Sequence, residues 1–268
     1  MTLKKLTDVF KKSGIESPER EAALMFMYFS GVSSASLLLD PSFDGAELLA
    51  AIERRLSGEP LAYILGECEF YSERYFVTKD CLIPRADTEC IVEYAIKNLP
   101  RGAFFADLCT GSGCIAISIL AHRPDCRAVA CDICDGAVEM AKKNAIENKV
   151  ASRLEILSHD VLSSALDGSF DAVISNPPYI RRDVLPTLSR EVQNEPTAAL
   201  DGGEDGLVFY RRICELYKDK IKENGFLLFE TGFDQKEDIQ SIAKESSLTC
   251  HCFNDYAGVQ RGAVMTKL

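Results

Sequence analysis

The stretch FFADLCTGSGCIAISIL, residues 104–120, combines three features that together predict how the chain folds. An apolar run suited to a buried strand ends near Asp107, a turn with Gly111 and Gly113 follows, and a second apolar run begins at Cys114. Glycine lets the backbone approach a ligand closely, and the start of a helix adds a positive electrostatic field. The stretch therefore predicts a strand, a ligand-binding turn and a helix of an α/β fold.

Short apolar runs alternate with helical patterns from about residue 100 onward. The expected strands are residues 103–107, 127–131, 154–157, 170–175, 225–230, 248–253 and 262–267. The expected helices are residues 114–122, 135–148, 206–223 and 234–246. This alternation predicts a doubly wound, mostly parallel, seven-stranded sheet. The last two strands have no helix between them and should pair antiparallel.

The chain before this region has a different character. Residues 1–64 carry helical patterns and no strand signal, whereas aromatic and β-branched residues surround the polar centre of residues 65–83. The second pattern predicts a hairpin. We therefore expect a small helical domain over residues 1–64, a hairpin linker over 65–83 and an α/β domain over 84–268.

Composition narrows the class of protein. The 268 residues are 47% hydrophobic and 26% charged, which is typical of a globular protein. No apolar run is long enough to span a membrane, and the first residues lack a signal-peptide pattern, so we expect a cytoplasmic protein without a membrane partner. The net charge of −11 argues against free nucleic acid as a partner, because phosphate binding depends on Lys and Arg. It is compatible with a basic protein partner.

The eleven cysteines are an odd number, and most lie in apolar runs, which favours reduced, buried thiols over disulfides. Cys131 and Cys134 have the spacing of a zinc or redox pair. No second pair of that spacing accompanies them, so we expect no metal site.

Two acidic residues follow later strands. Asp132 ends the second expected strand, where a carboxylate can accept both hydroxyls of an adenosine ribose. Asp160 follows the third strand and can accept from an adenine amino group with Val161 against the ring, although a plain turn aspartate is an alternative. The glycine turn by itself fits a nicotinamide dinucleotide or S-adenosylmethionine.

The stretch ISNPPYI, residues 174–180, ends the fourth expected strand at a polar amide. Two prolines with fixed φ hold Asn176 in place, and the prolines leave carbonyl groups free to accept. The Asn176 side-chain oxygen and the Pro177 carbonyl can accept both hydrogens of a planar NH₂ group, while Tyr179 packs on its flat face. This Asn-Pro-Pro-Tyr elbow predicts a site for an amide or for an exocyclic base amine.

These motifs in this order resemble the class I S-adenosylmethionine-dependent methyltransferases that act on planar nitrogens. Further stretches are similar to the HemK-type protein-glutamine methyltransferases, and the similarity covers nearly the whole chain. They are GEPLAYILGECEFY (58–71), LIPRADTE (82–89), NEPTAALDGGEDGLVFY (194–210), LLFETG (227–232) and DYAGVQR (255–261). The chain has Cys109 where that family often has glycine, and Val161 where it often has an aromatic residue nearby.

The resemblance implies methyl transfer from S-adenosylmethionine, with S-adenosylhomocysteine as product, to the glutamine of the GGQ motif in class-1 peptide chain release factors, an activity linked to translation termination. It implies that the helical domain helps to bind this partner. Taken with the strand ends, the expected cofactor-binding residues are Asp107, Cys109, Thr110, Gly111, Ser112, Gly113, Asp132, Asp160, Val161 and Asn176.

The expected substrate-binding residues are Asn176, Pro177, Pro178, Tyr179, Arg85 and Glu195, and those expected to be catalytic are Asn176, Pro177 and Tyr179. Arg85, Glu89 and Glu195 either line the mouth of the site or form ion pairs. We expect a monomer.

The resemblance also covers an enzyme acting on a ribosomal-protein glutamine. A DNA adenine N6-methyltransferase would use the same elbow on a flipped base, against which the acidic charge stands. A nicotinamide dehydrogenase or a protein that only binds adenosine would share the glycine turn but would not need the elbow.

Overall fold

The computed structural model describes residues 1–268, which form two compact units. The first contains residues 1–67 together with 189–194, and the second contains residues 68–188 and 195–268. No helix in either unit combines the length and apolar character that a membrane span requires.

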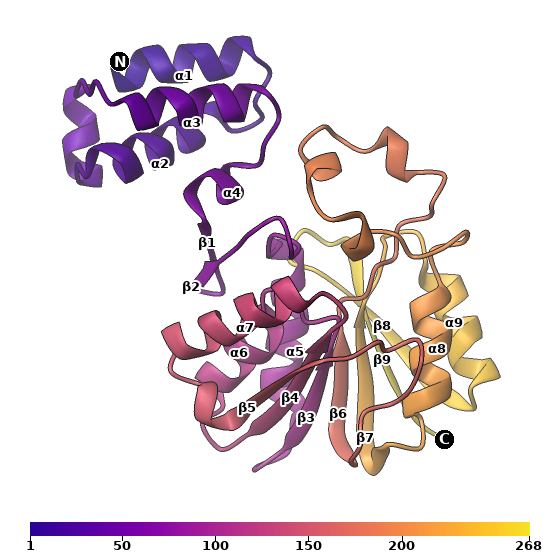
Figure 1. Ribbon diagram of the computed structural model, residues 1–268. Helices are drawn as coiled ribbons and strands as arrows, with labels where there is room; N and C mark the ends of the chain where they lie inside the picture. The colour runs from indigo at the N-terminus through magenta and orange to yellow at the C-terminus, as the bar shows by residue number, and fades with distance from the viewer. The chain divides into compact units, whose positions relative to one another are not determined.

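The first unit is a small helical bundle. Its helices are α1 (Leu3–Lys12), α2 (Pro18–Ser30), α3 (Ala46–Leu56) and the short α4 (Leu61–Leu65), as Figure 1 shows. Pro18 suits the first position of α2, and Gly31 ends that helix with a positive φ of 69°. Leu6, Phe10 and Phe26 are fully buried in its core.

A two-stranded hairpin begins the chain's β structure. Strands β1 (Glu67–Phe70) and β2 (Glu73–Phe76) pair with each other, and Tyr71 and Ser72 form the turn between them with φ values of 51° and 66°. Positive φ at both central residues matches the twist of the flanking strands. The expected hairpin is therefore present.

The second unit contains a seven-stranded sheet in the order β5-β4-β3-β6-β7-β9-β8. The strands are β3 (Phe104–Leu108), β4 (Arg127–Asp132), β5 (Leu154–Ser158), β6 (Phe170–Ser175), β7 (Ile221–Glu230), β8 (Leu248–Asn254) and β9 (Gln260–Lys267). Five strands are parallel, and β9 lies antiparallel between β7 and β8. This confirms the predicted doubly wound sheet and the antiparallel pairing of its last two strands.

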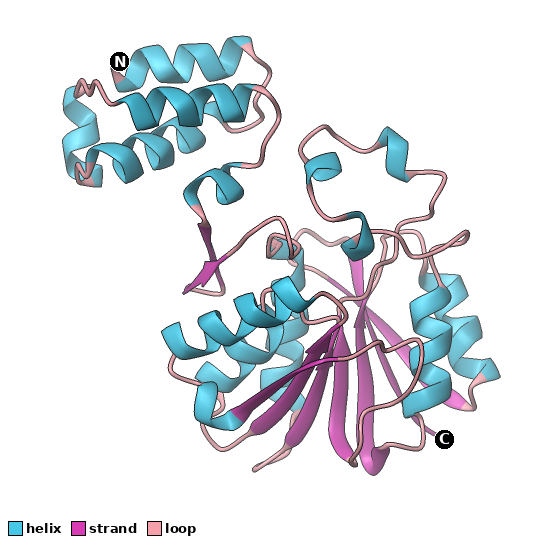
Figure 2. Ribbon diagram, viewed as in Figure 1, coloured by secondary structure: helices cyan, strands magenta, loops and turns pink.

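Helices cover both faces of this sheet (Figure 2). Helices α5 (Glu89–Asn98), α6 (Cys114–His122) and α7 (Asp135–Glu147) lie on one face, and α8 (Val208–Tyr217) and α9 (Lys236–Glu245) lie on the other. Side chains alternate along each strand, so Phe105 packs in the first apolar cluster and Ala106 in the second. Two separate cores hold the sheet between them.

One predicted helix is wrong over its last six residues, and the sequence patterns do not predict helix α5. Residues 206–223 were expected to be helical, but α8 ends at Tyr217 and β7 begins at Ile221. Ile221 pairs with Phe170 of β6, so β7 begins four residues before the expected strand. The intervening residues 222–224 are polar, as residues at the end of a helix often are. Helix α5 lies in a segment to which the sequence patterns assigned no element.

Candidate active site

The residues expected to carry chemistry meet at the carboxyl edge of the sheet. Strands β3, β4 and β6 run parallel side by side, and each is followed directly by a polar segment at this edge (Figure 1). The segments are the glycine turn (residues 109–113), Asp132 with the residues after it, and the Asn-Pro-Pro-Tyr elbow (residues 176–179). Open α/β sheets bind ligands at this edge.

The glycine turn depends on backbone conformations that L-residues rarely adopt. Cys109, Gly111 and Gly113 have φ values of 56°, 54° and 82°. A Cβ on Gly113 would lie 2.8 Å from Ile117 Cδ1 and 3.2 Å from Ala141 Cβ, so this glycine allows α6 to pack on α7. A Cβ on Gly111 would meet only Cys81 Cβ at 4.0 Å, which leaves the turn open to a ligand.

Asp107 lies fully buried in β3 beside this turn. Its Oδ2 accepts from Thr110 Oγ1 at 2.6 Å and from the Ala116 backbone N–H at 3.2 Å, while its Oδ1 has no hydrogen-bond partner. Burial raises the pKa of Asp107 to about 7. An unpartnered carboxylate oxygen in this position suits a ligand that brings a cationic or hydrogen-bonding group.

Asp132 both supports the turn and faces the cavity. Its Oδ2 accepts from the Gly111 N–H at 2.8 Å, and its Oδ1 accepts from the Cys134 N–H at 3.0 Å. A carboxylate has about four acceptor positions, so two remain for the hydroxyls of a ribose. Burial raises the pKa of Asp132, and these two backbone donors oppose that shift.

The elbow leaves two acceptors without a protein donor. Asn176 Nδ2 donates to Thr88 Oγ1 at 3.4 Å, which turns the side-chain oxygen away from Thr88. The structure shows no protein donor to that oxygen or to the Pro177 carbonyl. Tyr179 points elsewhere: its hydroxyl donates to Glu230 Oε1 at 3.2 Å.

Distant segments hold the elbow in place. Gln235 Nε2 donates to the Tyr179 carbonyl at 3.1 Å, and the Ile180 N–H donates to the Leu200 carbonyl at 3.0 Å. A Cβ on Gly202 would lie 2.7 Å from Tyr179 Cα, and one on Gly206 would lie 2.5 Å from the Tyr179 carbonyl oxygen. These two glycines of the GGEDG run therefore make room for the elbow, a role that its sequence pattern did not reveal.

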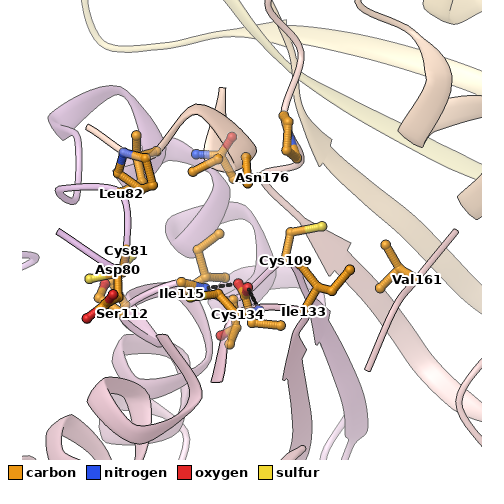
Figure 3. A pocket seen from close by; sticks show the side chains of 18 of the residues that line it. Asp80, Cys81, Leu82, Cys109, Ser112, Ile115, Ile133, Cys134, Val161 and Asn176 are labelled. Atoms are coloured by element: carbon orange, nitrogen blue, oxygen red, sulfur yellow. Dashed lines mark hydrogen bonds between the residues drawn. The ribbon is translucent and has the colours of Figure 1, made fainter. Parts of the chain in front are cut away.

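A cavity of about 270 Å³ opens between these segments (Figure 3). In that view, Asn176 and Leu82 lie above it, and Ser112, Cys134 and Ile133 lie below. The expected site residues that line it are Arg85, Cys109, Thr110, Gly111, Ser112, Asp132, Asp160, Val161, Asn176 and Pro178. Those that do not are Asp107, Gly113, Pro177, Tyr179 and Glu195.

Some lining residues are not among the expected site residues. Ile133 directly follows Asp132 and is exposed, and Leu82 comes from the loop after the hairpin. Both offer apolar surface to a flat ring. A position immediately after a strand-terminal acid was the available clue for Ile133, whereas Leu82 reaches the cavity only through tertiary folding.

Arg85 and Glu195 form an ion pair, and of the two only Arg85 lines the cavity. Arg85 lines the cavity, and its guanidinium contacts the Glu195 carboxylate. Glu195 is buried and also accepts from the Ile83 N–H at 3.1 Å. Asp160 accepts from the Leu162 N–H at 2.9 Å, as a turn aspartate does, and still lines the cavity.

Other observations bear on the chemistry of the site. All eleven cysteines are free, and no group of three or more His, Cys, Asp or Glu side chains is arranged to hold a metal ion.

Comparison with known structures shows the fold. The chain superposes on a methyltransferase from Pyrococcus furiosus with a TM-score of 0.55 at 16% identity, covering 71% of this chain and 86% of that one. It superposes on a ribosomal protein L11 methylase from Lactobacillus delbrueckii subsp. bulgaricus with a TM-score of 0.51 at 20% identity, covering 68% and 80%. The second unit thus has the class I methyltransferase fold.

Sequence comparison adds the family. A model described as the methyltransferase small domain matches residues 88–214, and a model described as the PrmC N-terminal domain matches residues 2–66. The chain is 37% identical to a bifunctional methyltransferase of Rickettsia felis over 90% of its own length, but it spans only 52% of that protein.

Two further relatives match along nearly their whole length. The chain is 36% identical to the release factor glutamine methyltransferase of Agrobacterium fabrum, covering 93% of this chain and 90% of that protein. It is 35% identical to the release factor glutamine methyltransferase of Caulobacter vibrioides, covering 90% and 86%. The chain belongs to the release factor glutamine methyltransferase family.

Proposed function

We propose that this chain transfers a methyl group from S-adenosylmethionine to the side-chain amide nitrogen of the glutamine in the GGQ motif of class-1 peptide chain release factors. The observation that carries the proposal is the elbow. Asn176 lies on the cavity with its Nδ2 held by Thr88, so its Oδ1 and the Pro177 carbonyl remain as a pair of acceptors for a planar NH₂ group. A glutamine side chain ends in such a group.

The cavity suits S-adenosylmethionine. The open glycine turn and the spare acceptor positions of Asp132 match a ligand with a ribose, while the unpartnered Asp107 Oδ1 is buried beside the turn and does not line the cavity. Val161 and Ile133 offer apolar contacts to the adenine, and Asp160 offers an acceptor for its amino group. When bound, this cofactor supplies an electrophilic methyl group on a sulfonium.

The residues of the elbow supply orientation. An amide nitrogen is a weak nucleophile because its lone pair is delocalised, so near-attack geometry and a dry surrounding have most to contribute. Acceptors on both N–H bonds increase the electron density on nitrogen and fix its direction. The amide becomes acidic once it is methylated, so its proton can leave after transfer without a strong base.

We assign partner recognition to the helical domain, residues 1–64. Several of its large apolar side chains are exposed, including Leu38, Leu39 and Leu49. Exposed apolar surface is typical of protein interaction sites. The net charge of −11 favours a basic protein over a nucleic acid.

The test is methyl transfer from labelled S-adenosylmethionine to a purified release factor, with a GGQ-to-GGA release factor, ribosomal protein and DNA run in parallel. We expect label on the release factor that disappears with the GGA variant. Label on ribosomal protein alone would keep the chemistry and change the partner. Label on DNA would contradict the argument from charge, and no label on any substrate would contradict the proposal.

A further inference from the structure

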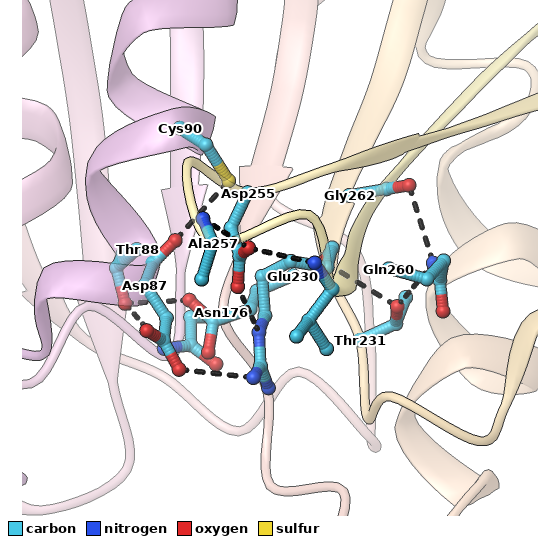
Figure 4. Close-up of polar contacts among 12 residues, drawn as sticks. Asp87, Thr88, Cys90, Asn176, Glu230, Thr231, Asp255, Ala257, Gln260 and Gly262 are labelled. Carbon is cyan, nitrogen blue, oxygen red and sulfur yellow. Dashed lines mark hydrogen bonds and ion pairs between the residues drawn. The ribbon is translucent and has the colours of Figure 1, made fainter.

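A buried carboxyl group lies behind the elbow without lining the cavity. Glu230 ends β7 with a side chain that is 1% exposed, and it is absent from the cavity wall. Its Oε2 accepts from Thr88 Oγ1 at 2.5 Å, and its Oε1 accepts from Tyr179 OH at 3.2 Å. Figure 4 shows Glu230 among Thr88, Asn176 and their polar neighbours. Glu230 therefore contacts Tyr179 of the elbow and Thr88, which bonds to Asn176, without lining the cavity.

The hydroxyl group of Thr88 connects Glu230 to Asn176 through two hydrogen bonds. A threonine hydroxyl has one hydrogen and two acceptor positions. When Glu230 is ionised, Thr88 must donate to it, and Thr88 Oγ1 then offers a lone pair to Asn176 Nδ2, 3.4 Å away. This arrangement keeps the NH₂ end of Asn176 toward Thr88 and leaves its side-chain oxygen without a protein donor.

Protonation of Glu230 would reverse this arrangement. The carboxyl group would donate to one of its two hydroxyl partners instead of accepting from both. Thr88 could then turn its hydrogen toward Asn176 Nδ2, and two donors would face each other, which favours the flipped amide. The flipped amide presents NH₂ to the substrate and removes one of its two acceptors.

We propose that ionised Glu230 is a positioning residue that orients the Asn176 amide through Thr88 and holds Tyr179, so that protonation of this one buried group switches methyl transfer off. The inference rests on the proposed function of the elbow, and it assigns to Glu230 no contact with substrate or cofactor.

Charged and titratable groups surround Glu230 on several elements. Arg261 of β9 faces it and pairs with Asp87, 2.9 Å away, while Asp255 lies 3.7 Å from the Arg261 guanidinium. Burial raises the pKa of Glu230 to about 7, opposed by Thr88, Arg261 and Tyr179 and reinforced by Asp87. Two further neighbours are Tyr210 of α8, which donates to the Glu230 backbone carbonyl at 2.9 Å, and Cys90 of α5, whose thiol pKa the Glu230 charge helps to raise.

The first test is the pH dependence of kcat/KM for release factor at saturating cofactor. We expect the wild-type rate to fall about tenfold per pH unit below about pH 7. Glu230→Gln always carries a donor amide, so we expect it to be at least about tenfold slower at pH 8 and nearly independent of pH between 6 and 8. Saturating cofactor limits the influence of Asp107, whose pKa also lies at about 7.

Variants of Thr88 separate positioning from stability. Thr88→Val removes the link between Glu230 and Asn176 and should slow transfer, whereas Thr88→Ser keeps the hydroxyl and should restore it. The matched control is Thr231→Val, which removes a buried hydroxyl next to Glu230 that bonds only to Gln260 and the Arg261 carbonyl. This control should keep the wild-type pH profile.

The second test needs no activity. The side-chain NH₂ resonances of Asn176, identified by their loss in Asn176→Ala, should shift with a midpoint near pH 7 in the wild type and stay constant in Glu230→Gln. An unchanged pH profile in Glu230→Gln, or resonances of Asn176 that do not titrate, would overturn the inference. Titrating resonances without any transfer to release factor would instead contradict the proposed function and leave the role of Glu230 standing.

Discussion

The glycine turn and the elbow lie at the same edge of the sheet, yet they are held in different ways. The turn is fixed mainly within one stretch of the chain: Asp107 bonds to Thr110 and Ala116, and Asp132 bonds to Gly111, 21 residues away. The elbow depends on residues far away in the chain, from Thr88 to Gln235. The cofactor half of the site is thus largely local, and the substrate half is assembled by the whole fold.

The largest expected effect comes from removing the acceptor on the elbow. Asn176→Ala should lower kcat by about 100-fold or more, because it deletes a group that orients the nucleophile in a dry site. Cofactor affinity, measured by calorimetry, should change only a few-fold, because the turn is unaltered. Asn98→Ala, at the exposed end of α5, serves as the control. Near-normal turnover in Asn176→Ala would contradict the assigned role of the elbow.

A pair of glycine variants should separate the two halves. In Gly206→Ala the new Cβ would lie 2.5 Å from the Tyr179 carbonyl oxygen, so kcat should fall by about tenfold or more with little change in cofactor affinity. In Gly113→Ala the Cβ would press on Ile117 and Ala141, so cofactor affinity and stability should fall together. Equal losses of cofactor affinity in both variants would show that the halves are not independent.

The elbow should also leave a signature in stability, because its support includes the buried Glu230. The pKa of this group rises from 4.5 to about 7 on folding, so the folded state binds more protons between these values. The free energy of unfolding should therefore fall as pH rises through this window and level off above it.

Glu230→Gln removes this contribution. The free energy of unfolding, measured with denaturant, should fall between pH 5 and pH 8 in both proteins. The fall should be smaller in Glu230→Gln than in the wild type, by on the order of 1–3 kcal/mol. Asp107 should still produce part of the decline, since burial raises its pKa too. Glu215→Gln, at an exposed site on α8, is the control. Identical wild-type and Glu230→Gln profiles would contradict the prediction.

The smallest expected effect concerns local strain in the turn. Cys109 adopts a φ of 56°, which is unfavourable for any residue that has a Cβ atom. Cys109→Gly should relieve about 1 kcal/mol of strain and lose a similar amount of apolar contact, so the free energy of unfolding should change by less than about 1 kcal/mol. A loss of several kcal/mol would mean that the thiol has a structural role beyond the turn.

Sequence patterns placed all seven strands of the sheet because each strand is a short apolar run with polar ends. They failed at residues 218–223, where Ile221 joins β7 through pairing with Phe170 rather than through any local preference. They also assigned no element to α5, which follows directly after Thr88. Neither error affects the predicted carboxyl ends of β3, β4 and β6, which are followed by or include the glycine turn, Asp132 and Asn176.

The residues expected to carry the chemistry were identified from short sequence motifs. The sequence analysis used the backbone freedom of Gly111 and Gly113, the charge of Asp132, and the fixed φ of the two prolines after Asn176. These are properties of single residues and of short spacings. The sequence indicated Glu230 only as a strand-end acid near the substrate edge. It gave no sign of Thr88 or Gly206 as supports of the elbow, because these residues acquire their partners only when segments more than 25 residues apart meet. The burial of these side chains and the directions of their hydrogen bonds arise only from the tertiary structure. Burial in turn raises the pKa of Glu230.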